Sequence, residues 1–584
     1  MSRATKKQQA EANIAPRPLQ WRFLLVGVVI ATVFTGLAVR AAYIQVISPD
    51  QLIEQGDNRT LRTRTSSVHR GMITDRNGEE LAVSVPVQTI WADPKVVHDR
   101  GGLQDMRRWK ALAQVIGDDV NALVERVADP SRRFVYLQRQ VTPAMAQYVQ
   151  KLAIPGIYLR QESRRYYPTG EVSAQLVGFT DIDDKGIEGV ERLFNDYLTG
   201  TPDTRKIRRD AKGRQVEILD ETQGEDPQDL SLTIDQRLQA LAYKEVKRAI
   251  QLYDAASASA VVVDVHTGEI LALVNAPSFN PNNRRGVTAH RIRNRVVTDT
   301  FEPGSVVKPM AVISALEYGA ATLDTQIDTS PGWMRVGGSM VQDGKNHGVL
   351  DLRGIIQKSS NMGTSKLALS VPKERFIDLY YEMGLIGDTG TNLIGESSGI
   401  FHDRSRWSEH ELAALSFGYN LAVTPLQVAR MYSIIANGGI KRPLSIIKGT
   451  PVQGERVLEE QYANAMVSML ESVVLDGGTA PKAAVPGYRV AGKTGTSRKA
   501  VAGGYGEEYA NLFVGIAPVS EPRLVCVVLV DEPGGDLYYG GDTAAPTFSR
   551  IMAGALQMLN IPPDDRPVSS IAALEQQQEG LHGG

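Results

Sequence analysis

The longest apolar run of the chain lies near its amino end. Residues 23–39 carry no charge and are mostly apolar, and after Arg40 the apolar character resumes through Ile47. That length is sufficient for one membrane-spanning helix. Five basic residues and one acid precede the run, which predicts a cytoplasmic amino end and a chain outside the membrane from about residue 48. A cleaved signal peptide is the alternative, but its apolar core is usually about 7 to 15 residues long.

The apolar pattern farther along predicts both helices and strands. Residues 306–318 carry a helical stripe after Pro303 and Gly304, so we expect a helix that begins at Ser305, with Pro309 near its start. Two helical stretches, 352–358 and 362–369, flank a short connection. Three apolar runs predict successive antiparallel strands at 488–497, 511–517 and 523–530.

Changes in composition suggest the domain boundaries. A charged, glycine-bearing stretch at 220–229 separates a piece of mixed hairpins and helices, residues 50–225, from a larger domain, residues 226–560. After residue 560 the composition turns to Pro, Gln, Ser and Gly, which predicts a disordered tail over 561–584. The amino-terminal parts are a tail of residues 1–22 and an anchor of residues 23–47. We expect an α+β protein.

Composition excludes some classes of function. The 584 residues allow two or three domains, and the net charge of −2 with no basic patch interleaved with aromatics gives no support for nucleic-acid binding. The single cysteine, Cys526, lies in an apolar run and is expected to be buried and inert. No G-x-G-x-x-G or P-loop string occurs, and Ala414 stands where a zinc protease with His410 and Glu411 would need a second histidine. No metal or other cofactor is indicated.

Three short strings indicate acyl-transfer chemistry without a histidine base. They are Ser305-Val306-Val307-Lys308, Ser359-Ser360-Asn361 and Lys493-Thr494-Gly495. Such chemistry needs an attacking hydroxyl, a group that takes its proton and a donor to the leaving amine, and Ser305, Lys308 and Ser359 could fill these roles. Lys493, Thr494 and Thr496 could hold a substrate carboxylate. For Lys308 to act as a base its pKa must be lowered, and Lys493 is the candidate neighbour.

Each string taken alone also has a structural interpretation. About one S-x-x-K is expected by chance in a chain of this length, and two others occur, at 370–373 and 445–448. Ser305 could be a helix cap, Ser359 to Asn361 a cap between helices, and the K-T-G string a glycine-containing edge strand. Gly492 and Gly495 could instead let a peptide substrate approach as an added strand.

Joined, the strings resemble the transpeptidase domain of the class B penicillin-binding proteins, and the resemblance covers nearly the whole chain after the membrane segment. Residues 70–84 resemble the amino-terminal signature of that class, a hairpin turning at Asn77 and Gly78. Residues 232–239 and 261–276 resemble the start of its catalytic domain and the first hairpin of its core sheet. Ser359-Ser360-Asn361, Ser416-Phe417-Gly418-Tyr419-Asn420 and Tyr538-Tyr539-Gly540-Gly541 point to the division-specific branch, although Asn420 stands where a glycine is expected.

The resemblance implies a D,D-transpeptidase that cross-links peptidoglycan stem peptides. The fold would be a penicillin-binding, serine β-lactamase-like domain, an antiparallel sheet flanked by helices, on an elongated noncatalytic pedestal. Ser305 would form the acyl-enzyme with loss of D-Ala, Asn361 would anchor an amide, and the amides of Ser305 and Thr496 would form the oxyanion hole. Tyr419, Tyr538 and Tyr539 would line the cleft, buried core aromatics being the alternative.

The resemblance also implies partners and a location. The expected partners are stem peptides ending in D-Ala-D-Ala, β-lactams, the membrane and division-complex proteins that include a septal glycan polymerase. The catalytic domain would lie outside the plasma (inner) membrane at the division site. The basic run Arg205 to Arg214 is expected to be a solvated turn, contact with anionic wall polymer being the alternative. Two other functions stay open, a hydrolase with the same site and a non-enzymatic scaffold or β-lactam sensor.

Overall fold

A computed structural model describes residues 20–47, 54, 57, 60–65, 69–210, 214–404, 406–501, 503–535 and 537–565. The chain divides into two compact units, which are treated separately below. Met1–Ser67 and Thr201–Glu225 form the first, and Val68–Gly200 and Asp226–Gly584 form the second. Most of the predicted cytoplasmic tail, residues 1–19, lies outside the described residues, as does the part of the predicted carboxyl-terminal tail from residue 566.

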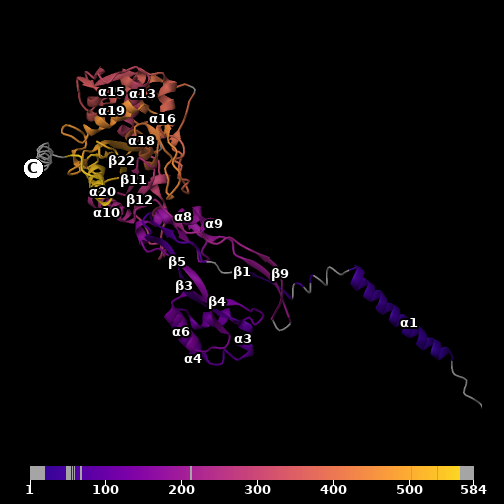
Figure 1. Cartoon of the computed structure of the whole chain (residues 1–584). Coiled ribbons are helices and arrows are strands. Elements are labelled where there is room, and N and C mark those ends of the chain that lie inside the picture. Colours follow the sequence, from indigo (N-terminus) through magenta and orange to yellow (C-terminus); the bar gives the residue numbers. More distant parts are fainter. Residues whose placement is uncertain are drawn as a thin grey trace, which may run out of the picture. The chain divides into compact units, whose positions relative to one another are not determined.

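The first unit contains the apolar helix. Helix α1 (Gln20–Ala42) continues into one π-helical turn, Tyr43–Ile47 (Figure 1). Trp21–Gln45 is long and apolar enough to cross a membrane, and its side chains are not buried within the protein. The predicted span of 23–47 therefore corresponds to a single continuous helical segment.

A three-stranded antiparallel sheet completes the first unit. Its order is β1 (Leu61–Thr65), β8 (Thr204–Arg209) and β9 (Gln215–Thr222). The expectation of a solvated turn is wrong for the first part of the basic run, which is strand β8. The run pairs there with β9, which places acids opposite it, with ion pairs of 2.6 Å from Arg205 to Glu221 and 3.1 Å from Arg208 to Glu217.

The amino-terminal part of the second unit, called the pedestal here, is built on three longer strands and two short ones. They are β2 (Ile73–Thr74), β3 (Glu80–Ala92), β4 (Val135–Val141), β5 (Ile157–Tyr166) and β10 (Leu230–Ser231). The order is β10-β2-β3-β4, and β5 also pairs with β3. The predicted hairpin forms between β2 and β3, where Gly78 has φ +91° and the Asn77 amide donates to Asp75 (2.7 Å).

Helices give the pedestal its own core. They are α3 (Pro94–Asp99), α4 (Met106–Ile116), α5 (Val120–Arg126) and α6 (Pro143–Lys151). Trp109 and Leu112 of α4 are fully buried with Ile90 of β3. Shorter elements follow: α7 (Ala174–Val177), β6 (Phe179–Thr180), β7 (Gly186–Glu188), α8 (Gly189–Leu193) and α9 (Asn195–Thr199).

A five-stranded antiparallel sheet forms the centre of the second unit. Its order is β12 (Ile270–Ala276), β11 (Ser257–Asp264), β23 (Leu524–Asp531), β22 (Gly504–Ala517) and β21 (Ala491–Val501). Helices α10 (Gln236–Tyr253) and α20 (Ala544–Met558) pack on the sheet together, and α18 (Pro425–Ala436) also packs on it. This cover explains why β11, β12 and β23 read as continuous apolar runs. Cys526 is buried in β23 as predicted.

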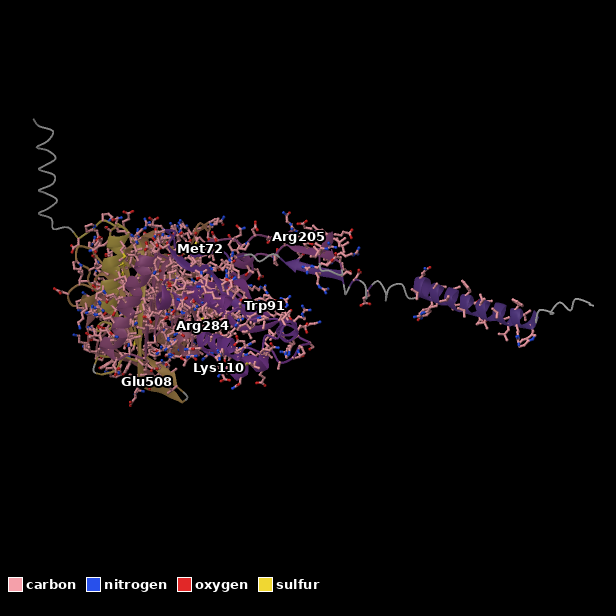
Figure 2. The ribbon with its side chains drawn as sticks, turned by 90° about the horizontal axis from the view of Figure 1, so that it is seen from below. Met72, Trp91, Lys110, Arg205, Arg284 and Glu508 are labelled. Carbon is pink, nitrogen blue, oxygen red and sulfur yellow. The ribbon has the colours of Figure 1, made fainter. Side chains whose placement is uncertain are left out.

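The three strands predicted near the carboxyl end are confirmed, and two of them are longer than expected. β21 and β22 form a long hairpin, which Figure 2 shows projecting near Glu508. The register places Lys493 opposite Val514 and Gly495 opposite Leu512. Because β21 is the last strand in the order, its outer edge is free to face the helices that carry the other two strings.

The remaining helices and ribbons of the second unit connect these layers. The helices are α11 (Ala289–Ile292), α12 (Arg295–Thr298), α13 (Lys308–Glu317), α14 (Leu352–Lys358), α15 (Asn361–Leu369), α16 (Lys373–Glu382), α17 (Glu409–Ser416) and α19 (Glu460–Glu471). The ribbons pair β13 (Gln326–Asp328) with β16 (Val349–Asp351), β14 (Trp333–Val336) with β15 (Ser339–Gln342), β17 (Ile400–Phe401) with β18 (Leu421–Ala422), and β19 (Ile440–Lys441) with β20 (Glu455–Arg456).

The chain stays bonded to the sheet domain beyond residue 560. Tyr488 donates its hydroxyl to the Ile561 carbonyl (2.7 Å), and Asp564 accepts from the amides of Arg489 (2.7 Å) and Ser520 (3.0 Å). These contacts involve the first residues of the segment predicted as a disordered tail, so the ordered chain runs at least to Asp565.

Candidate active site

Ser305 lies in a tight turn that leads into a buried helix. Gly304–Val307 form a 3₁₀ turn, and α13 begins at Lys308 with Pro309 in its first turn. The helix therefore begins three residues later than predicted, because the Lys308 amide bonds to the Ser305 carbonyl in the shorter 3₁₀ pattern. Ser305 is partly exposed at the amino end of the helical segment, whereas Lys308 is only 1% exposed.

Two glycines hold this turn against the rest of the domain. Gly418, with φ +92°, packs so closely that a Cβ on it would lie 2.1 Å from the Gly304 carbonyl oxygen. On β21, a Cβ on Gly495 would lie 2.9 Å from the Pro303 carbonyl oxygen. Glycine at both places lets two backbones close on the segment that carries Ser305.

Ser359 connects the two helices as predicted. It follows α14 in the left-handed region (φ +57°), and Ser360 caps α15 by accepting from the Gly363 amide (2.9 Å). The cap interpretation therefore holds for Ser360. Ser359 instead receives both lysines: Nζ of Lys308 lies 3.1 Å and Nζ of Lys493 lies 3.0 Å from its Oγ. The Ser359 carbonyl accepts a further bond from Lys308.

The surroundings of the two lysines favour their neutral forms. Burial, and then the charge of Lys493, lower the pKa of Lys308 well below its usual value, and the Asp343 carboxylate opposes this. Burial alone lowers the pKa of Lys493 to about 7. The neighbour expected from the sequence is therefore present, but removal from water is the larger effect.

Asp343, just after strand β15, organises the second string and was not anticipated from the sequence. Its carboxylate accepts from the Ser360 hydroxyl (2.6 Å) and from the amides of Asn361 (2.5 Å) and Met362 (3.1 Å). The Asn361 side chain donates to the Gln342 carbonyl (3.0 Å). An aspartate in a loop 17 residues before Ser360 carries no local signal of this role.

The third string lies on the edge strand β21 with its hydroxyls engaged. Thr494 bonds its hydroxyl to that of Thr479 (2.9 Å), and the Thr496 hydroxyl accepts from the Gly540 amide (3.0 Å). Gly540 fits because a Cβ on it would lie 2.4 Å from the Gly495 carbonyl oxygen. The segment containing Tyr538 and Tyr539 is thereby held against β21.

The role expected of the glycines on β21 is wrong in one respect. The missing Cβ atoms of Gly492 and Gly495 face the protein itself: Gly492 faces the ring of Phe513 at 2.5 Å, and Gly495 faces Pro303. These glycines therefore allow internal packing of the strand against its neighbours, and the edge itself remains the place where an extended peptide could add.

Exposed tyrosines border the same strand. Tyr538 and Tyr539 are 39% and 55% exposed, so the alternative of buried core aromatics does not apply to them. Tyr538 stacks on Tyr509 of β22 with ring centroids 5.3 Å apart. Tyr419 packs edge-on against Tyr505 at 5.8 Å. Desolvation raises the pKa of Glu302, three residues before Ser305, and its carboxylate accepts from the Tyr505 hydroxyl (3.3 Å).

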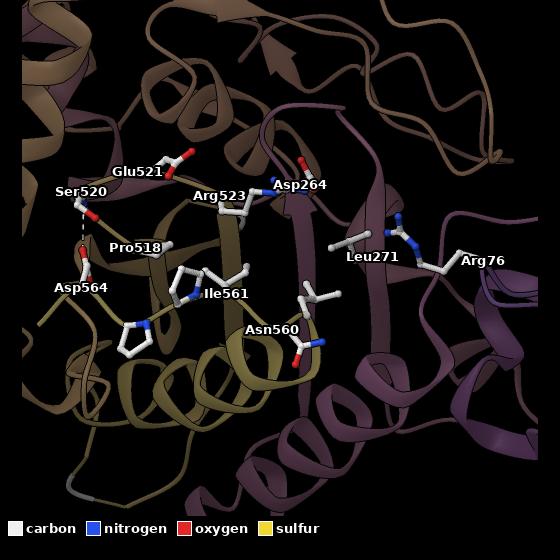
Figure 3. A pocket seen from close by; sticks show the side chains of 13 residues that line it. Arg76, Asp264, Leu271, Pro518, Ser520, Glu521, Arg523, Asn560, Ile561 and Asp564 are labelled. Atoms are coloured by element: carbon white, nitrogen blue, oxygen red, sulfur yellow. Dashed lines mark hydrogen bonds and ion pairs between the residues drawn. The ribbon is translucent and has the colours of Figure 1, made fainter. Parts of the chain in front are cut away.

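A pocket elsewhere on the domain is formed without any of the three strings. It has a volume of about 340 Å³ and lies beside Asp264, Arg523 and the segment that follows α20 (Figure 3). Its arginines are neutralised, since Arg523 pairs with Asp264 (3.1 Å) and Arg76 with Glu269 (3.2 Å). This pocket therefore contains none of the residues of the three strings, which meet instead at Ser359.

Comparison with known proteins identifies the family of the chain. Residues 258–553 match the penicillin-binding protein transpeptidase domain, and residues 65–232 match the penicillin-binding protein dimerisation domain. The chain is 49% identical over 562 residues to "Peptidoglycan D,D-transpeptidase FtsI" of Escherichia coli (strain K12), covering 96% of this chain and 95% of the relative. The chain belongs to the penicillin-binding protein transpeptidase family.

Solved structures share the fold of the chain. A peptidoglycan synthetase from Bifidobacterium adolescentis matches with a TM-score of 0.69 at 28% identity, covering 87% of this chain and 98% of that structure. Penicillin binding protein 3 from Mycobacterium tuberculosis, complexed with aztreonam, matches with a TM-score of 0.64 at 29% identity, covering 86% and 98%. The two-part architecture of pedestal and transpeptidase domain is therefore that of the family.

Proposed function

We propose that this chain, a serine-type peptidoglycan D,D-transpeptidase, works through acylation of Ser305. The observation that carries the proposal is that Lys308 and Lys493 both bond to the Ser359 hydroxyl. Lys308 lies one turn after Ser305. Neutral Lys308 takes the proton of the Ser305 hydroxyl, and Ser305 Oγ attacks the carbonyl of the penultimate D-Ala of a stem peptide. The lowered pKa of Lys308 supports this role.

The rest of the site supports the later steps. The backbone amides of Ser305 and Thr496 stabilise the oxyanion, a contribution of about 3 kcal/mol for each donor. The proton passes from Lys308 through Ser359 to the leaving amine, so that D-Ala departs and the acyl-enzyme remains. An amine of a neighbouring stem then attacks, and its proton returns to Ser305 by the same path. The terminal carboxylate of the donor stem is held by Lys493, Thr494 and Thr496. Asn361 binds an amide of the same stem.

β-Lactams are expected to acylate the same serine, because the relative from Mycobacterium tuberculosis was solved in complex with aztreonam. The test is labelling of the intact protein with a fluorescent penicillin. Ser305→Ala should abolish the label, whereas Ser370→Ala, from the second S-x-x-K string, should keep it. Label that persists on Ser305→Ala would remove Ser305 as the nucleophile.

The transferase is separated from a hydrolase by its products. With a donor stem and an excess of acceptor amine, we expect cross-linked product to exceed trimmed product, with minor carboxypeptidase activity. Predominant trimming under all acceptor concentrations would establish a carboxypeptidase instead. The names of the curated relatives and the 96% coverage of the chain favour the transferase.

The topology and location belong to the same proposal. Helix α1 is the anchor, the amino end lies in the cytoplasm, and the catalytic domain acts outside the inner membrane at the division septum with a septal glycan polymerase. The basic residues before α1 and the relative named FtsI support it. Protease protection of inverted vesicles and imaging of a tagged chain test orientation and location. Cytoplasmic exposure of the catalytic domain would contradict the proposal.

A further inference from the structure

A second polar pocket lies within unit 2, where the pedestal meets the loop that follows β12. It has a volume of about 320 Å³, and we call it the junction pocket. Arg164, Arg165 and Thr180 line it from the pedestal, and Asn282, Arg284 and Arg285 line it from the loop. None of these residues belongs to the three strings of the catalytic site.

The junction pocket carries uncompensated positive charge. In the described part of the chain, no carboxylate lies within ion-pair distance of Arg164, Arg284 or Arg285. Arg164 donates instead to the Asn282 carbonyl (3.2 Å), and Arg284 lies over the ring of Phe179 at 4.3 Å. The one acid in the lining is Asp181, whose carboxylate already accepts the amides of Asp183 (2.8 Å) and Lys185 (3.0 Å).

A buried guanidinium is also among the lining residues of the junction pocket. Arg165 is only 4% exposed, and its Nε pairs with Glu191 at 2.6 Å. Its Nη2 is buried and has no hydrogen-bond partner among the described residues. Nη2 is closed to solvent, so Arg165 offers a ligand no accessible donor there, and the exposed cations of the lining are Arg284 and Arg285.

The lining is held in place across the junction. The Asn282 side chain accepts from the Tyr167 amide (3.0 Å) and donates to the Tyr167 carbonyl (2.8 Å). This pair of bonds ties the loop at Asn282 to the residue that follows β5, which brings the loop arginines beside the pedestal. A ligand held by both sets would bridge the part matched by the dimerisation domain and the part matched by the transpeptidase domain.

The pocket beside Asp264 shows the contrast. It has a similar volume and two arginines, but Asp264 and Glu269 form ion pairs with these arginines. Two further acids, Glu521 and Asp564, also line that pocket. That pocket has no excess positive charge for an anion. The junction pocket does, and guanidinium groups bind carboxylates by paired, directional hydrogen bonds.

We propose that the junction pocket binds the carboxylates of a second, non-reacting peptidoglycan stem peptide, an inference that rests on the substrate class proposed above. A polymeric substrate presents many stems, each with a terminal carboxylate, close to the enzyme. A volume of about 320 Å³ accommodates the end of a peptide and not the face of a folded domain. An acidic segment of a partner protein is the other occupant with the same chemistry, and the experiment separates the two.

The experiment measures binding to full-length protein whose catalytic serine has first been blocked with penicillin. The probe is a synthetic pentapeptide stem ending in D-Ala-D-Ala, and binding is followed by calorimetry or equilibrium dialysis. We expect saturable binding that weakens at least about tenfold in Arg284→Ala/Arg285→Ala, since each charge-assisted bond contributes about a factor of ten or more. The same stem with its carboxylates amidated should also bind at least about tenfold more weakly.

The matched control removes two positive charges elsewhere. Arg107 and Lys110 are exposed on α4 of the pedestal, and Lys110 is labelled with Arg284 in Figure 2. Arg107→Ala/Lys110→Ala should bind the stem as the unaltered protein does. Equal weakening in both double variants, absence of saturable binding to the blocked protein, or binding of an acidic polypeptide but not of the stem would each overturn the proposal. Penicillin labelling of Ser305 is scored separately, so failure of the catalytic proposal is recognised before this measurement.

Discussion

Lys308 and Lys493 place their ammonium nitrogens 3.1 and 3.0 Å from one oxygen, the hydroxyl of Ser359. Both side chains are almost completely buried, and only Asp343 opposes the effect of the second lysine on the first. Burial disfavours protonation of both lysines, and the charge of Lys493 further disfavours protonation of Lys308. The arrangement thus lowers the pKa of Lys308 and favours a neutral amine beside the Ser305 turn.

The rate of acylation is expected to fall on the acid side of its pH profile, and this part of the profile is called the acid limb here. Lys493→Met should move the acid limb to higher pH. Lys493 lowers the pKa of Lys308, so its removal lets Lys308 keep a proton to higher pH, and the neutral base is then populated only in more alkaline solution. The rate of penicillin acylation measured between pH 5 and 10 reports the shift. Loss of the substrate contact should also lower the rate at every pH.

The matched control for that variant is an exposed lysine on the pedestal. Lys110→Met should leave both the position of the acid limb and the plateau unchanged. An unmoved limb in Lys493→Met would mean that Lys308 is not the group whose ionisation limits acylation.

Asp343→Asn should move the same limb in the opposite direction. The Asp343 carboxylate raises the pKa of Lys308, so its neutralisation lowers that pKa further, and the limb shifts to lower pH. The plateau should fall by roughly tenfold, because the carboxylate also holds Ser360 and the amide of Asn361. Asp351→Asn removes a carboxylate that caps α14 through the Gly354 amide (2.6 Å), and it should not shift the limb.

Lys493 should also make the stability of the folded protein depend on pH. Its pKa is about 7 in the folded state and about 10.4 in an unfolded chain. Between pH 7 and pH 10.4 the unfolded state binds more protons than the folded state, so the free energy of unfolding rises with pH. The contribution of Lys493 to that free energy is fully present above about pH 10.4 and is lost as the pH falls toward 7. The slope is at most about 1.4 kcal/mol per pH unit.

Thermal midpoints of the unaltered protein and of Lys493→Met, measured from pH 7 to 9.5, test this linkage. The difference between the two thermal midpoints should change with pH. The midpoint of the unaltered protein should rise relative to that of the variant as the pH rises. A constant difference over this range would mean that Lys493 is not neutralised by folding.

The local elements of the site follow from the sequence, and their meeting does not. Pro303 and Gly304 before an apolar stripe predict a helix start near Ser305, and the apolar runs predict the strands around Lys493 within a few residues. That Ser359 receives both lysines depends on tertiary packing, since 51 and 134 residues separate it from Lys308 and Lys493. The expectation that these segments meet came from the resemblance to a family and not from residue patterns.

Asn420 illustrates a departure that structure explains. A glycine is expected at this position, and the residue has φ +67°, a left-handed conformation that asparagine tolerates better than most side chains. Its amide group donates to the Glu411 carbonyl at 3.3 Å. The loop therefore keeps its shape without the glycine. Asp343 and Gly418 could not be found in this way, because what each contacts is remote in the sequence.

Gly418→Ala should impair catalysis more than it impairs stability. A Cβ there would lie 2.1 Å from the Gly304 carbonyl oxygen, so the turn that carries Ser305 must move, and a displacement of about 1 Å in a reacting group costs on the order of a hundredfold in rate. The left-handed backbone adds strain of about 1 to 2 kcal/mol. Gly503 provides the control, since it has nearly the same φ, +93°, and nothing within 4 Å of the added Cβ. Gly503→Ala should carry similar strain with an unchanged rate of penicillin acylation, and equal rates in the two variants would show that the contact with Gly304 does not position Ser305.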